Sequence, residues 1–129
     1  MKRLVAGSVM VAAACTGSPA APGGLPLPDW RGPAVHCRHL GDGGLEVELV
    51  APTAGHVFEL GEVARSPGRA DVHLRHRPPT ADLVAQVITP LRLVVPAERL
   101  GDARCVAIWI ASPAVDAGAE RLAIAVARP

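Results

Sequence analysis

Lysine is almost absent from this chain of 129 residues, in which Lys2 is the only one. The rest of the chain therefore offers no amine side chain for a Schiff base or a phosphate-binding loop. Its serines beyond the N-terminal run are Ser18, Ser66 and Ser112, and none lies in a Gly-x-Ser-x-Gly motif. No pair of carboxylates can be assigned to one cleft. The sequence thus predicts a protein that is not an enzyme and has no cofactor.

An excess of charge of either sign is also lacking. The chain has 13 basic and 12 acidic residues, which gives a formal net charge of +1. Nucleic acids attract strongly basic surfaces, and this composition provides none. We therefore expect no nucleic-acid partner.

The N-terminal residues have the order of a secretory signal. Lys2 and Arg3 precede a short apolar run that ends at Cys15, and this run is too short to span a bilayer as a permanent helix. The three alanines before Cys15 resemble a bacterial lipobox, in which the cysteine is diacylated and becomes the new N-terminus. Residues 1–14 are therefore interpreted as a lipoprotein-type signal peptide.

Lipidation at Cys15 would anchor the exported protein to the membrane of the cell envelope, on its periplasmic or outer face. Cleavage near Ala14 or Ala21 would instead give a soluble secreted protein. Residues 15–33 are rich in proline and glycine and predict a disordered tether. Within it, Trp30 is expected to dock on the edge of the domain, with contact to a partner as the alternative. Residues 34–129 are then a single β domain.

The remaining cysteines, Cys37 and Cys105, have no other assigned role. In an exported chain, two such thiols most simply form a disulfide. We therefore predict a Cys37–Cys105 bond, which would stabilise the domain by roughly 4 kcal/mol in the chain-entropy model.

The hydrophobic pattern predicts an all-β fold. Alternation of apolar and polar residues, or short apolar runs between Pro and Gly breaks, indicates about six strands. A change of parity at Gly61 indicates a β-bulge, and a single helical turn is expected just before Gly101. Such strands predict a small antiparallel sandwich or a partly open barrel. The expected strands are residues 45–49, 57–64, 69–77, 84–96, 103–111 and 121–127.

The stretch 84–96 is expected to organise the fold. It reads as a buried strand that contains Pro90, which cannot donate to a ladder, so the strand must bend or lie at an edge. We interpret it as a bent segment where the chain passes from one sheet to the other. Gln86 would satisfy backbone groups left open by Pro90, and Thr89 fits the extended conformation favoured before proline.

The histidines suggest an alternative. A metal site could use His36, Cys37 and His39, with Cys105, His56, His73 and His76 as further ligands. The spacing matches no standard zinc pattern, so we predict no metal and a disulfide flanked by solvated histidines. On the outward face of strand 69–77, His73, Arg75 and Arg77 form a basic stripe that is either a solvated face or a docking patch.

The order of features over residues 52–95 carries a family resemblance. Thr53-Ala54-Gly55-His56 begins a strand, a hairpin ends at Pro78-Pro79, and Ala85-Gln86-Val87-Ile88-Thr89-Pro90 leads into an apolar run. This order resembles the C-terminal domain of PrcB-like proteins, which are exported lipoproteins associated with stabilising a surface protease complex. The chain departs from that pattern at Ala54, His56, Ala85 and Leu91.

The resemblance implies an adaptor or stability role without catalytic residues, in which the positions of Gly55, Gln86, Thr89 and Pro90 matter most. Our leading hypothesis is a non-enzymatic envelope lipoprotein domain that binds or stabilises a partner protein, with a protease complex as one candidate. The alternatives are a periplasmic metal-binding module and a protease inhibitor.

Overall fold

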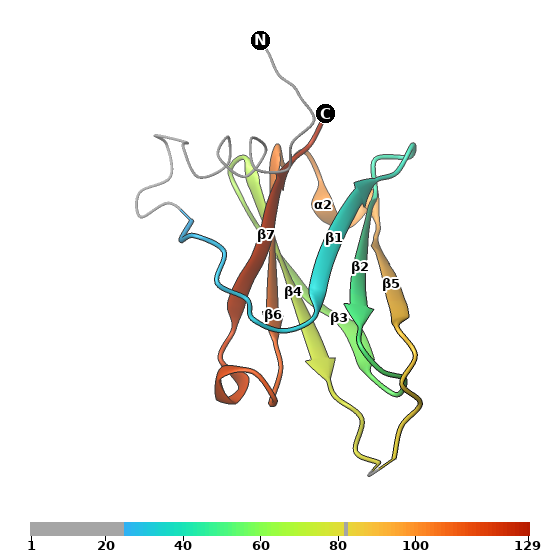
Figure 1. The fold of residues 1–129 in the computed structure, drawn as a ribbon. Helices are drawn as coiled ribbons and strands as arrows, with labels where there is room; N and C mark the ends of the chain where they lie inside the picture. Colours follow the sequence, from blue (N-terminus) through green and yellow to red (C-terminus); the bar gives the residue numbers. More distant parts are fainter. Residues whose placement is uncertain (1–24, 82) are drawn as a thin grey trace.

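Seven strands form two sheets that face each other in the computed structural model, which describes residues 25–81 and 83–129 (Figure 1). The all-β prediction is confirmed. The expected signal peptide, the lipidation site Cys15 and the first part of the tether lie outside the described residues. The strands are β1 (Ala34–His39), β2 (Leu45–Ala51), β3 (Val57–Ser66), β4 (Arg69–Arg77), β5 (Thr89–Val95), β6 (Cys105–Ala111) and β7 (Arg121–Ala127).

The smaller sheet has the order β1-β2-β5, and both of its pairs are antiparallel. β2 alternates as the sequence predicts, because Leu45, Val47 and Leu49 are buried while Glu46 and Glu48 are only half-buried. This alternation places one face of the sheet in the core and the other in solvent. β1 was not among the expected strands, since its inward side chains are only Val35 and Cys37.

The larger sheet has the order β3-β4-β6-β7. The predicted β3–β4 hairpin is confirmed, and so is the bulge, since the register shifts between Leu60 and Val63. A side chain at Gly61 would lie 2.8 Å from the carbonyl oxygen of His73, which explains the glycine. The β4–β6 pair is parallel, so the predicted antiparallel pairing is wrong for these two strands, while the other pairs are antiparallel. The chain leaves this sheet after β4, forms β5 and returns beside β4 in the same direction.

The core lies between the two sheets. Leucine, isoleucine and valine side chains from β2, β4 and β6 fill it, together with Val95 and Leu100. Leu100 ends the single-turn helix α2 (Ala97–Leu100), and Gly101 closes that turn with a φ of 60°, as the sequence predicts. Burial of these aliphatic side chains is the main stabilising contribution.

The stretch 84–96 differs from its prediction. Only Thr89–Val95 is a strand, and it pairs with β2 alone at the edge of the smaller sheet. Residues 85–88 are exposed and irregular, so the chain passes from the larger sheet to the smaller one through a loop and not through a bent, buried strand. The prediction of a buried strand was wrong for residues 84–88 because an exposed apolar run has the same composition as a buried one.

Pro90 lies on an edge strand and not in the sheet interior. It is exposed and lies opposite Val50 on the edge strand, where the missing amide costs little and discourages further strand pairing. We therefore expect Pro90→Ala to change the free energy of unfolding by less than about 1 kcal/mol. Urea denaturation followed by circular dichroism measures this, and a loss of more than about 2 kcal/mol would restore the organising role.

The segment before β1 is attached to the domain. The amides of Asp29 and Trp30 both donate to the carbonyl oxygen of Leu122 on β7, and the Trp30 indole Nε1 donates to the carbonyl oxygen of Pro33 at 2.8 Å. The expected docking of Trp30 is confirmed, and the packed domain begins before residue 34. Across the described residues, no helix is long and apolar enough to cross a membrane.

Candidate functional site

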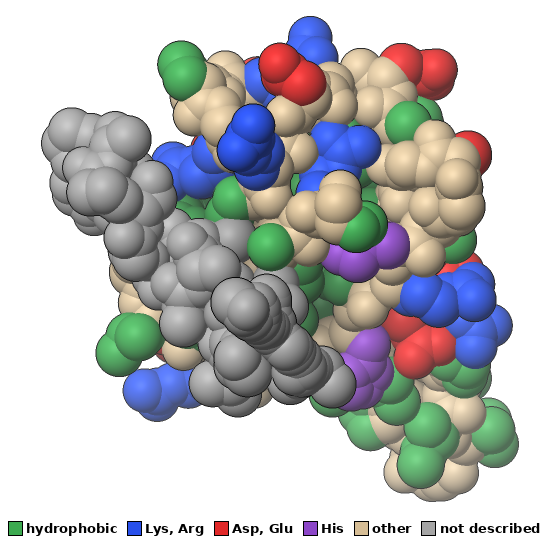
Figure 2. Space-filling view, turned by 90° about the horizontal axis from the view of Figure 1, so that it is seen from above, with side chains coloured by type: hydrophobic (Ala, Val, Ile, Leu, Met, Phe, Trp, Pro, Cys, Tyr) green, Lys and Arg blue, Asp and Glu red, His purple; other side chains and the backbone are tan. Residues whose placement is uncertain are grey.

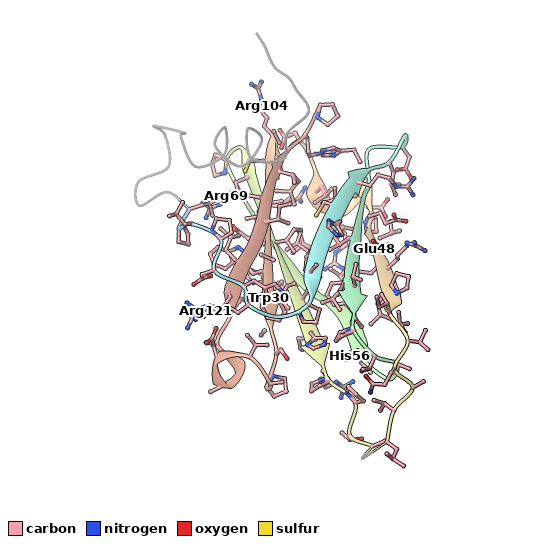
Figure 3. All side chains as sticks on the ribbon, viewed as in Figure 1. Trp30, Glu48, His56, Arg69, Arg104 and Arg121 are labelled. Atoms are coloured by element: carbon pink, nitrogen blue, oxygen red, sulfur yellow. The ribbon has the colours of Figure 1, made fainter. Side chains whose placement is uncertain are left out.

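One end of the sandwich brings four polar side chains into a hydrogen-bonded row. They come from the β2–β3 turn, the last residues of β4 and the residue that follows β6. The row consists of Thr53, His56, His76 and Ser112, and we call it the histidine relay. His56, labelled in Figure 3, marks its place beside the end of β4.

Local sequence explains the position of the two imidazoles. Ala70, Val72 and Leu74 alternate into the core along β4, so His76 continues the inward face. His56 follows Gly55, whose φ of +89° favours glycine and whose missing side chain leaves room for Pro79. The family-motif prediction at Gly55 thus has a structural basis. The alternation could have indicated that His76 is buried, but no sequence signal pairs it with His56 or Ser112, which are 20 and 36 residues away.

The distances in the histidine relay are those of good hydrogen bonds. Nδ1 of His56 lies 2.8 Å from Nε2 of His76, and Nδ1 of His76 lies 2.9 Å from Oγ of Ser112. Nε2 of His56 is 3.0 Å from Oγ1 of Thr53. The two rings stack with centroids 5.0 Å apart, and Trp30 meets His76 edge-on at 6.3 Å.

Burial governs the protonation of His76. His76 is 2% exposed and Ser112 is 1% exposed, whereas His56 and Thr53 are half-buried. Desolvation, with a smaller contribution from His56, lowers the pKa of His76 below its ordinary value. His76 is therefore held neutral at neutral pH.

The histidine relay superficially resembles the serine, base and orienting residue of a hydrolase. Ser112 Oγ, however, already accepts a hydrogen bond from the amide of Ala114 at 3.3 Å, and its burial keeps it from any substrate carbonyl. The arrangement satisfies polar groups inside the domain, and Ser112 is too buried to act as a nucleophile on a substrate.

A second feature lies at the same end. Residues 78–88 connect β4 to β5 and extend beyond the strand ends in Figure 1. Three large aliphatic side chains of this connection are in solvent: Leu83 is 92% exposed, Ile88 71% and Val87 59%. We call these three residues the apolar loop. Such a concentration of exposed aliphatic side chains is typical of an interaction site.

Comparisons with protein-family models, curated proteins and solved structures found no match. The resemblance to PrcB-like proteins therefore stays a prediction. Of its key residues, Thr89 donates from Oγ1 to the carbonyl oxygen of Val87 at 2.9 Å. The side chain of Gln86 is exposed and makes no hydrogen bond to another described residue, so the backbone role expected for it is wrong.

The Cys37–Cys105 disulfide is also wrong, because Cys37 has a free thiol. Cys37 lies on the inward face of β1, against the core. Cys105 alternates with Val106 and Ile108, which face the core, so its side chain is on the outer face of the larger sheet. Burial raises the pKa of the Cys37 thiol to about 12.

The remaining histidines are dispersed. His36 and His39 are exposed on β1, and His73 is on the outer face of the other sheet, where its Nδ1 lies 2.7 Å from a Glu120 carboxylate oxygen. Among the residues that the structure describes, no three side chains converge as metal ligands.

Two of the three side chains of the predicted docking stripe have acidic partners. Beside the His73–Glu120 pair, Arg77 lies 3.5 Å from Glu59, and Arg75 is exposed. The His73–Glu120 and Arg77–Glu59 pairs favour a solvated face for the stripe. Basic side chains also lie beside acidic ones on the surface that is seen from above in Figure 2.

The outer face of the smaller sheet is hollowed by about 430 Å³. Ion pairs cross it, since Arg92 lies 2.8 Å from Glu48 and Arg38 lies 3.2 Å from Glu46. Glu48, labelled in Figure 3, belongs to this face. Because the charges compensate each other between adjacent strands, they are explained by sheet pairing alone.

Proposed function

We propose that this chain is a non-enzymatic domain of the cell envelope that binds a partner protein through the apolar loop. The observation that supports this most strongly is the exposure of Leu83, Val87 and Ile88 within six residues of one connection. Elsewhere in the described residues, exposed large hydrophobic side chains are single, as on ordinary surfaces.

The chemistry of the loop favours a protein over a lipid surface. From residue 78 to residue 91 the only charged residue is Asp82, and no lysine or arginine is present. Loops that insert into anionic membranes usually carry basic residues beside the apolar ones. A convex apolar loop fits an apolar pocket on a partner, where aliphatic anchors are desolvated on binding.

The envelope location rests on the sequence of residues 1–15, and the protease complex rests on the resemblance over residues 52–95. Both remain part of the proposal. The hydrogen-bonded, buried state of Ser112 and His76 supports the non-enzymatic role.

The test is capture of partners by the full-length protein purified from membranes after crosslinking. The wild type should recover a stoichiometric protein partner. A variant with Leu83→Ser, Val87→Ser and Ile88→Ser should bind it at least tenfold more weakly, because three anchors are lost, while its unfolding midpoint should be unchanged.

Leu27→Ser is a matched control, since Leu27 is 82% exposed but lies outside the loop. It should bind like the wild type. Recovery of the monomer alone, or equal capture by the triple variant, would contradict the proposal. Loop-dependent sedimentation of the purified protein with phosphatidylglycerol vesicles would identify a lipid surface instead.

A further inference from the structure

We propose that the histidine relay is a pH-sensitive latch that holds the base of the apolar loop in place at neutral pH and releases it in acid. The inference rests on the proposed function for its biological role. Its structural basis is the β2–β3 turn, which contacts both the relay and the loop.

The turn is tied on two sides. His56 binds His76 of β4 through the 2.8 Å hydrogen bond. The amide of Ala54, two residues earlier, donates to the carbonyl oxygen of Ala85 at 3.1 Å, and Ala85 lies between Leu83 and Val87. Gly55 packs against Pro79, near the start of the connection between β4 and β5 that carries the apolar loop. Displacement of His56 would therefore disturb the base of the loop directly.

The latch opens when both imidazoles are protonated. With both imidazoles neutral, each of the three hydrogen bonds can have one donor and one acceptor. One added proton is also tolerated, because a doubly protonated His56 donates to Thr53 and to His76, which in turn donates to Ser112. A second proton places N–H groups on both nitrogens of the 2.8 Å contact. That hydrogen bond is then lost, and two cations face each other.

Among the described residues, no carboxylate pairs with either imidazole to compensate the second positive charge. Within the described part of the chain, neither imidazole contacts a carboxylate in the relay, and residues 52–55 and 112–115 of the two flanking turns carry no charge. On β4, Arg75 and Arg77 alternate with His76 and project from the opposite face, and on β3 Glu59 pairs with Arg77. Beside Trp30, Arg31 is exposed. Asp29 and Asp116 both pair with Arg121, at 3.3 and 3.2 Å.

The direction of the pH effect follows from linkage. Burial holds the pKa of His76 below 6.5, its value when solvated. In the opened form His76 is solvated and binds a proton below pH 6.5, whereas in the closed form the buried His76 stays neutral at the same pH. The opening equilibrium constant should therefore rise by up to about tenfold per pH unit until the pKa of the closed form is reached.

Amide hydrogen exchange of Ala54, followed by NMR between pH 7.5 and 5, tests the latch without any partner. The protection factor of this amide should fall at least fivefold below pH 6.5. The Leu40 amide, which donates to Gly44 at the opposite end, is the control and should keep its protection. A constant Ala54 protection factor in the wild type would overturn the proposal.

His76→Gln should abolish the pH dependence, because an amide donates and accepts but does not titrate. If that variant fails to fold, His56→Gln, at a half-buried position, should reduce the pH dependence, because a protonated His76 then faces a neutral amide that can accept its N–H group. Unchanged pH dependence in a folded variant would refute the latch. Once a partner is known, its release in acid tests the biological role, and that result is separate from the exchange measurement.

Discussion

Replacing His76 with alanine is expected to lower the free energy of unfolding by about 3 kcal/mol. The imidazole is 2% exposed, lies at the end of the core and makes hydrogen bonds on both sides. For a domain of this size, such a loss corresponds to a fall in melting temperature of roughly 15 °C.

Two contributions add up to this effect. Ser112 is buried and would lose its imidazole partner, and an unsatisfied buried hydroxyl costs roughly 1–3 kcal/mol. The missing ring would also leave a space against Trp30 and His56 that the rigid strand ends fill only in part. Both costs arise because the partners stay buried after the ring is removed.

His73→Ala is the matched control on the same strand. His73 is on the opposite face, and its partner Glu120 is exposed, so its removal should cost less than about 1 kcal/mol. Urea unfolding of both variants at pH 7.5 makes the comparison. Equal stabilities would mean that the histidine relay contributes nothing to the fold.

The sequence predicted most of the larger sheet and β2, because alternation reports directly which face of a strand is buried. The bulge at Gly61 and the end of the helical turn at Gly101 were also predicted correctly, because neighbouring residues determine each of these local conformations. β1 was missed because its exposed His36, Arg38 and His39 hide a weak alternation. The parallel β4–β6 pair depends on where β5 goes, and local patterns carry no such information.

The candidate site was harder to predict because local sequence patterns do not show which distant residues meet in the fold. His56, His76 and Ser112 meet only because a turn and two strand ends converge at one end of the sandwich. The apolar loop was assigned to the core because composition alone does not distinguish an exposed apolar segment from a buried one. Features that depend on tertiary position were thus beyond the sequence, while features fixed by local geometry were accessible to it.

Cys37 provides the sharpest test of the corrected fold. Its thiol should react with iodoacetamide about 1,000-fold more slowly in the native protein than in the unfolded chain at pH 8. The reason is that thiolate is the reactive species and burial raises the pKa from 9.0 to about 12. Mass spectrometry of the tryptic peptide 32–38, which contains this cysteine and no other, reports the rate at this position.

Denaturation without a reductant then distinguishes the free thiol from the disulfide that the sequence predicted. A free Cys37 becomes fully labelled as soon as urea exposes β1 to solvent. A Cys37 bonded to Cys105 would stay unmodified in urea until a reductant is added, and that outcome would contradict the structure. Rapid labelling of the native protein would also contradict it, because the inward face of β1 would then not be buried against the core. The labelling pattern therefore tests both the pairing of the cysteines and the packing of the strand that the sequence missed.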